Sequence, residues 1–318
     1  MNLPSELMIA IDSEIKNLNR KDLICDAKAI SDRYRFESGT SKSLLTTDSE
    51  ALAYVISRMP ATYSAVHSAV STVSNLISDR TLTLLDVGAG TGAATFAISQ
   101  QTNLKEITCL ERENVMIDLG KRLMQGTDAL KNVNWVKFDL LSQEINRQAD
   151  LVVASYVLSE LSKIERQKLL KQLWNATNEL LIIVEPGTPK AYKEIQNSRE
   201  LLLGLGAYMV APCPHSNTCP LTENDWCHFS CRVQRSAAHK QLKSGTAPYE
   251  DEKFTYLIVS KNKTLPEDNR ILRHPQVRSK LVMLEMCTQK GLKNLTVTKS
   301  EGEKYKHARK LSAGDILK

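Results

Sequence analysis

The sequence contains no apolar segment that approaches the roughly 20 residues needed to cross a bilayer. It also contains no internal repeat and no low-complexity segment. Residues 1–16 carry three acidic residues and one lysine, unlike a secretory leader or an arginine-rich, acid-poor transit peptide. We therefore expect a cytoplasmic protein that does not associate with membranes.

Acidic residues are scarce in the last quarter of the chain. Residues 232–318 contain 19 Lys and Arg but only 9 Asp and Glu, a net charge of +10, whereas residues 1–231 carry a net charge of −4. Such a segment is either a solvated tail or a surface for a polyanion, and we favour nucleic acid. The candidate contacts are Arg232, Arg235, Lys240, Lys243, Arg270, Arg273, Arg278 and residues 304–310.

The hydrophobic pattern predicts a helical region over residues 1–80, followed by an α/β domain. Apolar residues recur at helical spacing from Leu3 to Leu18, and Pro60 separates the predicted helices 51–59 and 63–77. From residue 81, short β-type segments alternate with helices of 10–15 residues, which is typical of a parallel, doubly wound, Rossmann-like sheet. The predicted strands are 81–87, 105–110, 134–138, 151–156, 180–184, 254–260 and 280–286.

We expect the α/β domain to span residues 81–260, with a cysteine-rich insertion at about 205–235. In this arrangement strands 254–260 and 280–286 are the sixth and seventh of the sheet. A small, basic, β-rich extension is expected over residues 261–318.

A glycine-rich loop directly follows the first predicted strand. Glycines permit a tight turn, and the next helix offers free backbone N–H groups to a nucleotide-like ligand. The segment fits a dinucleotide fingerprint loosely, but Asp86-x-Gly88-x-Gly90-x-Gly92 resembles more closely the motif of class I S-adenosylmethionine-dependent methyltransferases. That resemblance implies that Glu111, at the end of strand two, holds the ribose, and that Asp139-Leu140, after strand three, recognises the adenine.

Two catalytic signatures are missing from the chain. Strand four is followed by no Asn/Asp-Pro-Pro-Tyr/Phe tetrapeptide, which orients an amino nitrogen in many methyltransferases, and no 5-methylcytosine-type cysteine nucleophile is seen. The sequence therefore predicts a cofactor pocket without identifying a catalytic base.

Four of the seven cysteines fall within nineteen residues: Cys213, Cys219, Cys227 and Cys231. Without a secretory signal, such a cluster favours a soft metal centre over disulfides. The tight Cys-x2–4-Cys knuckle of zinc fingers is absent, and the wide spacing suits an iron–sulfur cluster at least as well. Spacing alone selects Cys231 as the fourth ligand.

Several segments together resemble the mitochondrial small-ribosomal-subunit methyltransferase-like family and its bacterial relatives. The resemblance covers nearly the whole chain, and its segments are LPSEL, RMPATYSAV, LLDVGAGTGAATFA, CLERENVMIDLGKRL, EPGTP, APCPHSNTCPL, DWCHFSCRVQRS and EDEKFTYLIVSK. It implies a methyltransferase-type domain, an iron–sulfur cluster and association with the small ribosomal subunit during assembly. The chain departs from the family pattern at Ala313, where relatives have tryptophan before Gly-Asp.

The resemblance also implies a ligand set that differs from the one chosen by spacing. It assigns the cluster, expected to be of the 4Fe-4S type with zinc as the alternative, to Cys213, Cys219, Cys227 and the distant Cys287. Cys231 is then a spare cysteine, and His215 and His228 are expected near the metal or facing RNA rather than ligating.

Three functions follow from these observations. The first is a small-subunit assembly factor, monomeric away from the ribosome, that binds S-adenosylmethionine, a metal cluster and rRNA. The second is an active rRNA methyltransferase. The third is a small-molecule methyltransferase, against which the charge of +10 over residues 232–318 argues.

Overall fold

The structure is a computed structural model, and it describes residues 1–16, 23, 25–26, 29–30, 45–222, 224–242 and 246–317. Its main domain is an α/β fold around one mixed sheet, with strand order β3-β2-β1-β4-β5-β8-β6 and with β7 paired to β8. The strands are β1 (Thr81–Val87), β2 (Asn103–Glu111), β3 (Asn134–Lys137), β4 (Ala149–Ser155), β5 (Thr177–Pro186), β6 (Tyr208–Ala211), β7 (Phe229–Gln234) and β8 (Tyr249–Ser260).

The first five strands are parallel, and β8 inserts antiparallel between β5 and β6. Near-continuous apolar segments form the centre of this sheet because both of its faces are covered. In β5, for example, all residues from Leu180 to Glu185 are buried. This is a Rossmann-like α/β arrangement, and the βαβ part of our prediction is confirmed.

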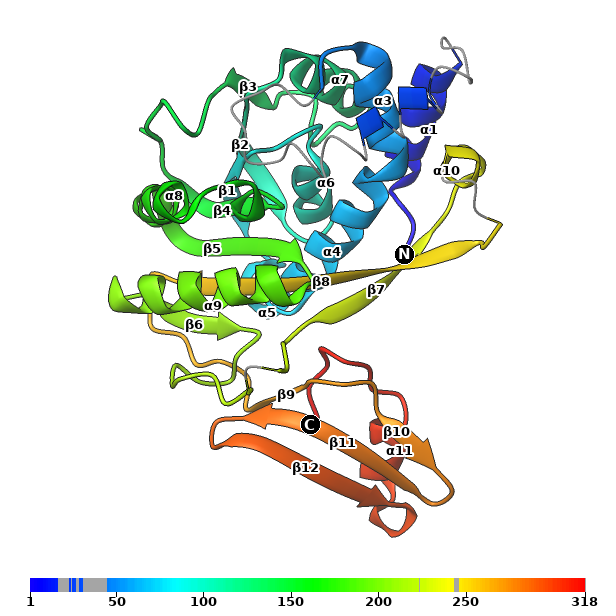
Figure 1. The fold of residues 1–318 in the computed structure, drawn as a ribbon, viewed down its shortest axis with the longest axis vertical. Helices are drawn as coiled ribbons and strands as arrows, with labels where there is room; N and C mark the ends of the chain where they lie inside the picture. Colours follow the sequence, from blue (N-terminus) through cyan, green and yellow to red (C-terminus); the bar gives the residue numbers. More distant parts are fainter. Residues whose placement is uncertain are drawn as a thin grey trace.

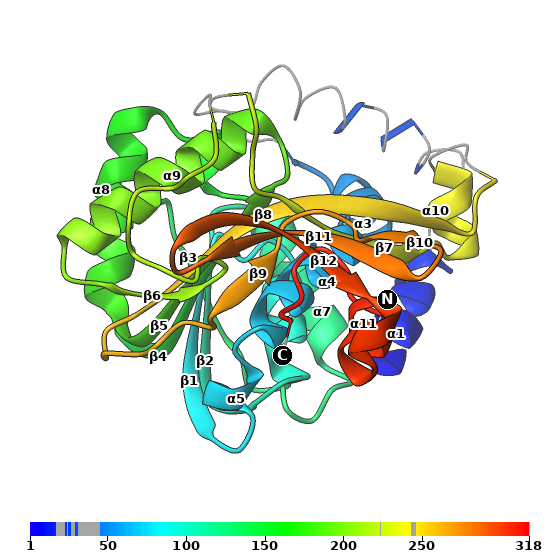
Figure 2. The ribbon, with the colours of Figure 1, turned by 90° about the horizontal axis from the view of Figure 1, so that it is seen from below.

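Helices cover the two faces of the sheet, as Figures 1 and 2 show. Helices α8 (Lys163–Ala176) and α9 (Pro189–Gly204) pack on one face. The helices of the other face are α1 (Ser5–Ile15), α3 (Asp48–Ser57), α4 (Met59–Ser71), α6 (Ala93–Ser99) and α7 (Asn114–Met124), and the short helices are α5 (Ser74–Ile77), η1 (Leu158–Glu160) and α10 (Ala237–Leu242). The predicted break at Pro60 is correct to within a residue or two, since Pro60 lies in the first turn of α4.

The sixth and seventh strands differ from our prediction. The sixth and seventh in chain order are β6 and β7, neither of which we predicted, and the eighth is β8, which contains the segment 254–260. Four residues are too few for a clear periodic pattern, which explains why β6 was missed. The cysteine-rich segment consequently lies between β6 and β8, rather than before the sixth strand.

The C-terminal residues form a second, separate sheet that lies below the main domain in Figure 1. It contains β9 (Asn269–Ile271), β10 (Gln276–Arg278), β11 (Leu281–Thr288) and β12 (Gly291–Thr298), followed by η2 (Lys299–Glu301) and α11 (Glu303–Ala308). The predicted strand 280–286 belongs to this sheet as β11. A small core of its own, which includes Ile271, Val282 and Tyr305, holds it together.

No helix in the described part of the chain is long and apolar enough to span a membrane.

Candidate functional site: a cofactor cavity and a four-cysteine cavity

The glycine loop after β1 lies at the carboxyl edge of the parallel strands, where ligands bind in open α/β sheets. Gly88 has a φ of 70°, and a Cβ there would lie 2.5 Å from Val157 Cγ2, so a side chain would collide with the loop after β4. Gly90 has a φ of 57°, and its N–H donates to Glu111 Oε2 at 2.8 Å. The loop is therefore held by the end of β2 and left open toward a ligand.

One cavity collects five of the seven residues predicted to bind the cofactor: Gly88, Gly90, Glu111, Asp139 and Leu140. The other two, Asp86 and Gly92, lie outside its lining. Asp86 is fully buried, and its carboxylate accepts hydrogen bonds from the N–H (3.1 Å) and hydroxyl (2.7 Å) of Thr95, so it braces helix α6. Gly92 is the N-cap of the same helix.

The two carboxylates predicted to bind the cofactor, those of Glu111 and Asp139, already accept hydrogen bonds from neighbouring backbone N–H groups. Glu111 accepts N–H groups from Gly90, Arg112 and Glu113 at 2.8–2.9 Å, and burial raises its pKa. Asp139 accepts the N–H of Leu141 and the hydroxyl of Ser142, both at 3.0 Å. A carboxylate offers about four lone-pair sites, so both groups keep acceptor capacity for ribose or adenine.

Side chains that no sequence motif indicates also line the cavity, among them Tyr54, Tyr156 and Glu160. Tyr156 has a φ of 59°, unusual for a bulky residue, and its hydroxyl donates to Glu252 Oε1 at 2.8 Å. Glu160 has no hydrogen-bond or ion-pair partner among the described residues. Burial first, then the carboxylates of Glu185 and Glu111, raise its pKa to about 7. Proximity of Glu160 to strand four is the only signal that could have identified it.

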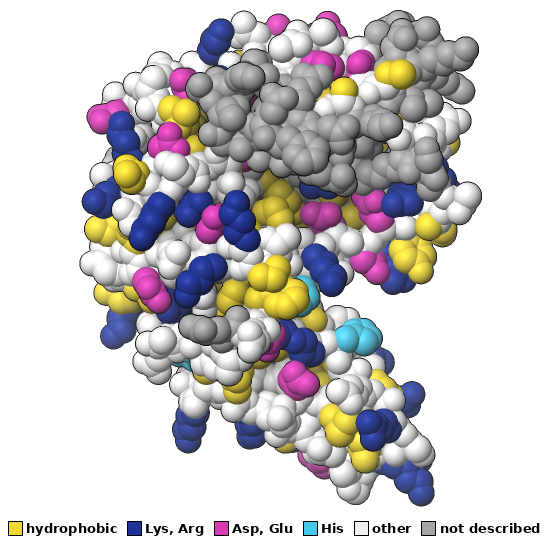
Figure 3. Space-filling view, in the orientation of Figure 1, with side chains coloured by type: hydrophobic (Ala, Val, Ile, Leu, Met, Phe, Trp, Pro, Cys, Tyr) yellow, Lys and Arg dark blue, Asp and Glu magenta, His cyan; other side chains and the backbone are white. Residues whose placement is uncertain are grey.

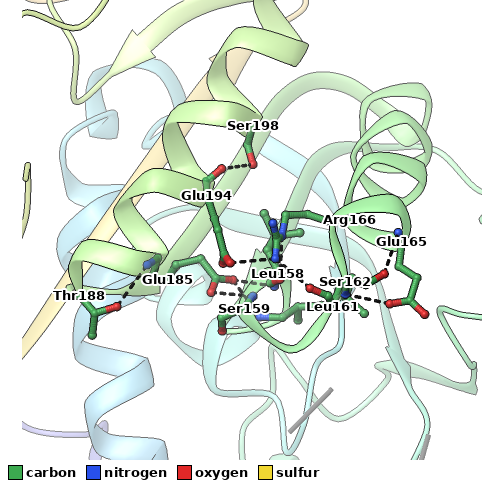
Figure 4. A network of polar contacts seen from close by, with 12 residues as sticks. Leu158, Ser159, Leu161, Ser162, Glu165, Arg166, Glu185, Thr188, Glu194 and Ser198 are labelled. Atoms are coloured by element: carbon green, nitrogen blue, oxygen red, sulfur yellow. Dashed lines mark hydrogen bonds and ion pairs between the residues drawn. The ribbon is translucent and has the colours of Figure 1, made fainter. Parts of the chain in front are cut away.

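A buried network fixes the loop that carries Glu160 (Figure 4). The Glu185 carboxylate at the end of β5 accepts the N–H groups of Val157 (3.0 Å), Leu158 (2.7 Å) and Ser159 (3.1 Å). Arg166 of α8 donates to the carbonyls of Leu158 and Leu161, and pairs with Glu194 of α9 at 2.9 Å. The wall of the cavity is therefore rigid before any ligand binds.

A second cavity brings together four cysteines from distant parts of the chain: Cys213, Cys219, Cys227 and Cys287. Cys213 follows β6, Cys219 and Cys227 lie in the segment before β7, and Cys287 is on β11 of the C-terminal sheet. Tyr192 of α9 closes another side, with its hydroxyl 3.1 Å from Cys219 Sγ. These are the four residues implied by the family resemblance.

Cys231 lies outside this cavity. It is one of the inward-facing residues of β7 and packs in the core beneath α4. Burial first, then the carboxylate of Glu252, raise its pKa to about 12. For Cys227, by contrast, burial and the neighbouring thiols of Cys213, Cys219 and Cys287 raise the pKa. Spacing in the sequence favoured Cys231. Because side chains alternate between the two faces of a β-strand, however, the side chain of Cys231 points into the core and away from the four-cysteine cavity.

Two buried arginines line the four-cysteine cavity. Arg199 and Arg270 are 5% and 4% exposed, and both donate hydrogen bonds to backbone carbonyls: those of His215 and Asn217 for Arg199, and those of Pro212 and Gly314 for Arg270. Neither has a carboxylate partner among the described residues. Buried charges require compensation, so the cavity suits an anionic group. As they stand, no three His, Cys, Asp or Glu side chains of the described residues are arranged as a metal site.

The basic residues of the C-terminal quarter divide into two groups. Arg270 is buried, and Arg232, Arg235 and Arg273 pair with Asp251, Glu250 and Asp225. Their part in RNA binding is therefore limited by internal contacts that the sequence could not reveal. Exposed cations on the C-terminal sheet and α11 include Arg278, Lys293, Lys304 and Lys306. Lys243, also predicted to contact RNA, lies outside the described residues.

The chain is similar to curated mitochondrial proteins of human and fission yeast. It is 28% identical to the human mitochondrial ribosome assembly protein METTL17 over 301 residues, which covers 87% of this chain and 64% of that protein. It is 25% identical to the Rsm22-cox11 tandem protein 2 of Schizosaccharomyces pombe, covering 85% of this chain and 43% of that one. The chain thus spans less than two thirds of the length of either relative.

Solved structures of similar fold include methyltransferases. The magnesium protoporphyrin IX methyltransferase of Synechocystis, with bound S-adenosylmethionine, covers 74% of this chain and 97% of its own at 13% identity and a TM-score of 0.42. The plantazolicin methyltransferase BpumL covers 77% and 98%, at 15% identity and a TM-score of 0.41.

These comparisons correct one prediction. We expected a cytoplasmic protein, but the relatives from human and fission yeast are named as mitochondrial, and so is the matching family. The acidic character of residues 1–16 was therefore a poor guide to location. The family model described as mitochondrial small ribosomal subunit Rsm22 matches residues 48–318, and the chain belongs to that family.

Proposed function

We propose that this protein is an assembly factor of the small ribosomal subunit that binds S-adenosylmethionine, a thiolate-held metal centre and rRNA. The observation that carries the proposal is the family match over residues 48–318, which includes both cavities. The name of the human relative, a ribosome assembly protein, supports the same role.

The first cavity fits S-adenosylmethionine in shape and in charge. Gly88 and Gly90 line the cavity with backbone alone, and Glu111 and Asp139 retain acceptors for ribose and adenine. The lining also contains Glu160. The cofactor carries a sulfonium and an ammonium group, and such cations favour a carboxylate-rich pocket.

The second cavity fits a metal centre held by Cys213, Cys219, Cys227 and Cys287, an iron–sulfur cluster or, alternatively, zinc. Four thiolates would give the centre a net negative charge, which Arg199 and Arg270 would offset. The ligands come from the segment after β6 and from the C-terminal sheet, so a bound centre would join the two. Its binding free energy would then contribute directly to folding. We infer a structural role for it.

We further propose that the basic extension over residues 261–318 binds rRNA. Among the described residues, the exposed Arg278 and Lys293 form no ion pair, and the pairs Lys304–Glu301 and Lys306–Glu303 lie on the surface, where ion pairs are weak. Phosphates can therefore compete for these side chains.

The test is depletion of the protein followed by sucrose-gradient analysis of ribosomal particles. Loss of mature small subunits with accumulation of a precursor, together with sedimentation of the protein with that precursor, is the expected result. Normal small-subunit levels after complete depletion would refute the assembly role.

An active rRNA methyltransferase is the second candidate, and Glu160 favours it. A carboxylate with a pKa of about 7 in the cofactor cavity is suited to accept a proton from the methyl acceptor. Mass spectrometry of rRNA from cells with and without the protein tests this: a modification that disappears supports transfer, and identical modification maps exclude it.

A further inference from the structure

A stacked aromatic pair lies where the cysteine-rich segment meets the C-terminal part of the chain. The rings of Trp226 and His228 have centroids 5.0 Å apart and an interplanar angle of 22°. Both side chains are half-buried, so part of the pair reaches solvent. The two residues flank Cys227, whose thiol points into the four-cysteine cavity.

Hydrogen bonds within the pair and to neighbouring residues hold the two rings in place. The indole N–H of Trp226 donates to the carbonyl of Gly187 at 3.0 Å, just beyond the end of β5. Nδ1 of His228 lies 3.2 Å from the carbonyl of Trp226. Arg273 bonds to the carboxylate of Asp225 and to the carbonyl of Trp226. A ligand that binds these rings would therefore meet a preorganised surface and lose little affinity to side-chain ordering.

Charged groups of both signs lie near the rings. Arg273, Lys253 and the carboxylate of Asp225 all act electrostatically on the His228 ring, and because Asp225 pairs with Arg273, Lys253 is the unpaired cation of the three among the described residues. Lys253 is exposed, and its carbonyl accepts the N–H of Gly187 at 2.8 Å, which places it beside the Trp226 anchor. Figure 3 shows hydrophobic and histidine side chains gathered at the recess between the main domain and the C-terminal sheet, with lysine and arginine side chains around them.

We propose that Trp226 and His228 form a stacking platform for one unpaired base of RNA, with Lys253 facing the adjoining phosphates. The proposal rests on the rRNA-binding part of the proposed function and adds to it a site and a preference for single strands. Aromatic faces bind bases of any sequence by stacking, and neighbouring cations attract the backbone. A base inside a duplex has both faces covered by its neighbours and cannot use such a platform.

The variant His228→Ala removes one ring of the pair, His228→Phe preserves an aromatic ring, and His274→Ala is the matched control. His274 is an exposed histidine next to Arg273 and outside the stack. Affinities of the full chain for a single-stranded RNA oligonucleotide, and for the same strand in a duplex, are measured by fluorescence anisotropy across a salt series.

We expect His228→Ala to weaken binding of the single strand about five- to hundred-fold, with little change for the duplex and an unchanged salt slope. His228→Phe and His274→Ala should bind like the unaltered protein, and Lys253→Ala should mainly reduce the salt slope. Equal losses in His228→Ala and His274→Ala, or equal losses for single strand and duplex, would overturn the platform.

A measurement without variants guards against a change in folding. RNA with 5-iodouracil in an unpaired position is irradiated in complex with the unaltered protein, and the cross-linked peptide is identified by mass spectrometry. Cross-linking at Trp226 or His228 supports the proposal, and cross-linking only elsewhere overturns it. Failure of the unaltered protein to bind any RNA would instead refute the rRNA-binding function itself.

Discussion

Glu160 permits a sharp test of the cofactor cavity, because its side chain is half-buried and forms no hydrogen bond or salt bridge with another described residue. Burial and the carboxylates of Glu185 and Glu111 raise its pKa to about 7. If the sulfonium of S-adenosylmethionine lies beside Glu160, it stabilises the ionised form and lowers this pKa. The affinity for S-adenosylmethionine should therefore rise as the pH increases through 7 and fall as the pH drops below it.

The magnitude follows from the ionised fraction. With a pKa of about 7, roughly one tenth of the Glu160 carboxyls are ionised at pH 6 and about nine tenths at pH 8. If binding requires the ionised form, the affinity rises about ten-fold, which corresponds to about 1.4 kcal/mol. Calorimetry at pH 6, 7 and 8 measures this. S-adenosylhomocysteine, which has the same ammonium group but an uncharged sulfur, provides the comparison.

The variant Glu160→Gln keeps the shape of the side chain and removes its charge, so S-adenosylmethionine should then show the weaker pH dependence of S-adenosylhomocysteine. Asp86→Asn is the control, because Asp86 also has a pKa raised to about 7, mainly by burial, but lies outside the cavity lining. Our assignment of Glu160 would be refuted if both ligands show the same pH dependence in the unaltered protein. It would also be refuted if the difference between them persists in Glu160→Gln.

Three further predictions concern the other groups. Glu111→Ala should weaken S-adenosylmethionine binding about 30- to 1000-fold in calorimetry, since a charge-assisted pair of hydrogen bonds is lost; unchanged binding would contradict the ribose assignment. Serine at Cys213, Cys219, Cys227 or Cys287 should abolish the iron and sulfide (or zinc) content of anaerobically purified protein, whereas Cys231→Ser should retain it; the reverse pattern at Cys231 and Cys287 would place the fourth ligand on β7. Arg278→Ala should lower the salt slope of RNA binding by about one, whereas Arg270→Ala should lower the melting temperature, because Arg270 links Pro212 to Gly314; the opposite assignment of effects would refute this division of the basic residues.

Local patterns in the sequence determined the βαβ part of this protein. The apolar segment Thr81–Val87, the glycines after it and the acid Glu111 at the end of the next strand are features of neighbouring residues, so they can be read along the chain. The cofactor cavity was predictable for the same reason, because the carboxyl ends of parallel strands meet at one edge of the sheet.

Contacts between distant segments were decided only by the tertiary structure. The residues between strands four and five carry no motif. The position of Glu160 in the cavity depends instead on Glu185, a residue of β5 whose carboxylate fixes the loop. Cys231 is close to the other cysteines in sequence, but on β7 its side chain points into the core. Cys287 is more than fifty residues further along the chain, and β11 places it at the cavity. Arg270, read as an RNA contact, is buried there too. Contacts between segments so far apart in sequence depend on which surfaces pack together, and the residue pattern within either segment does not predict them.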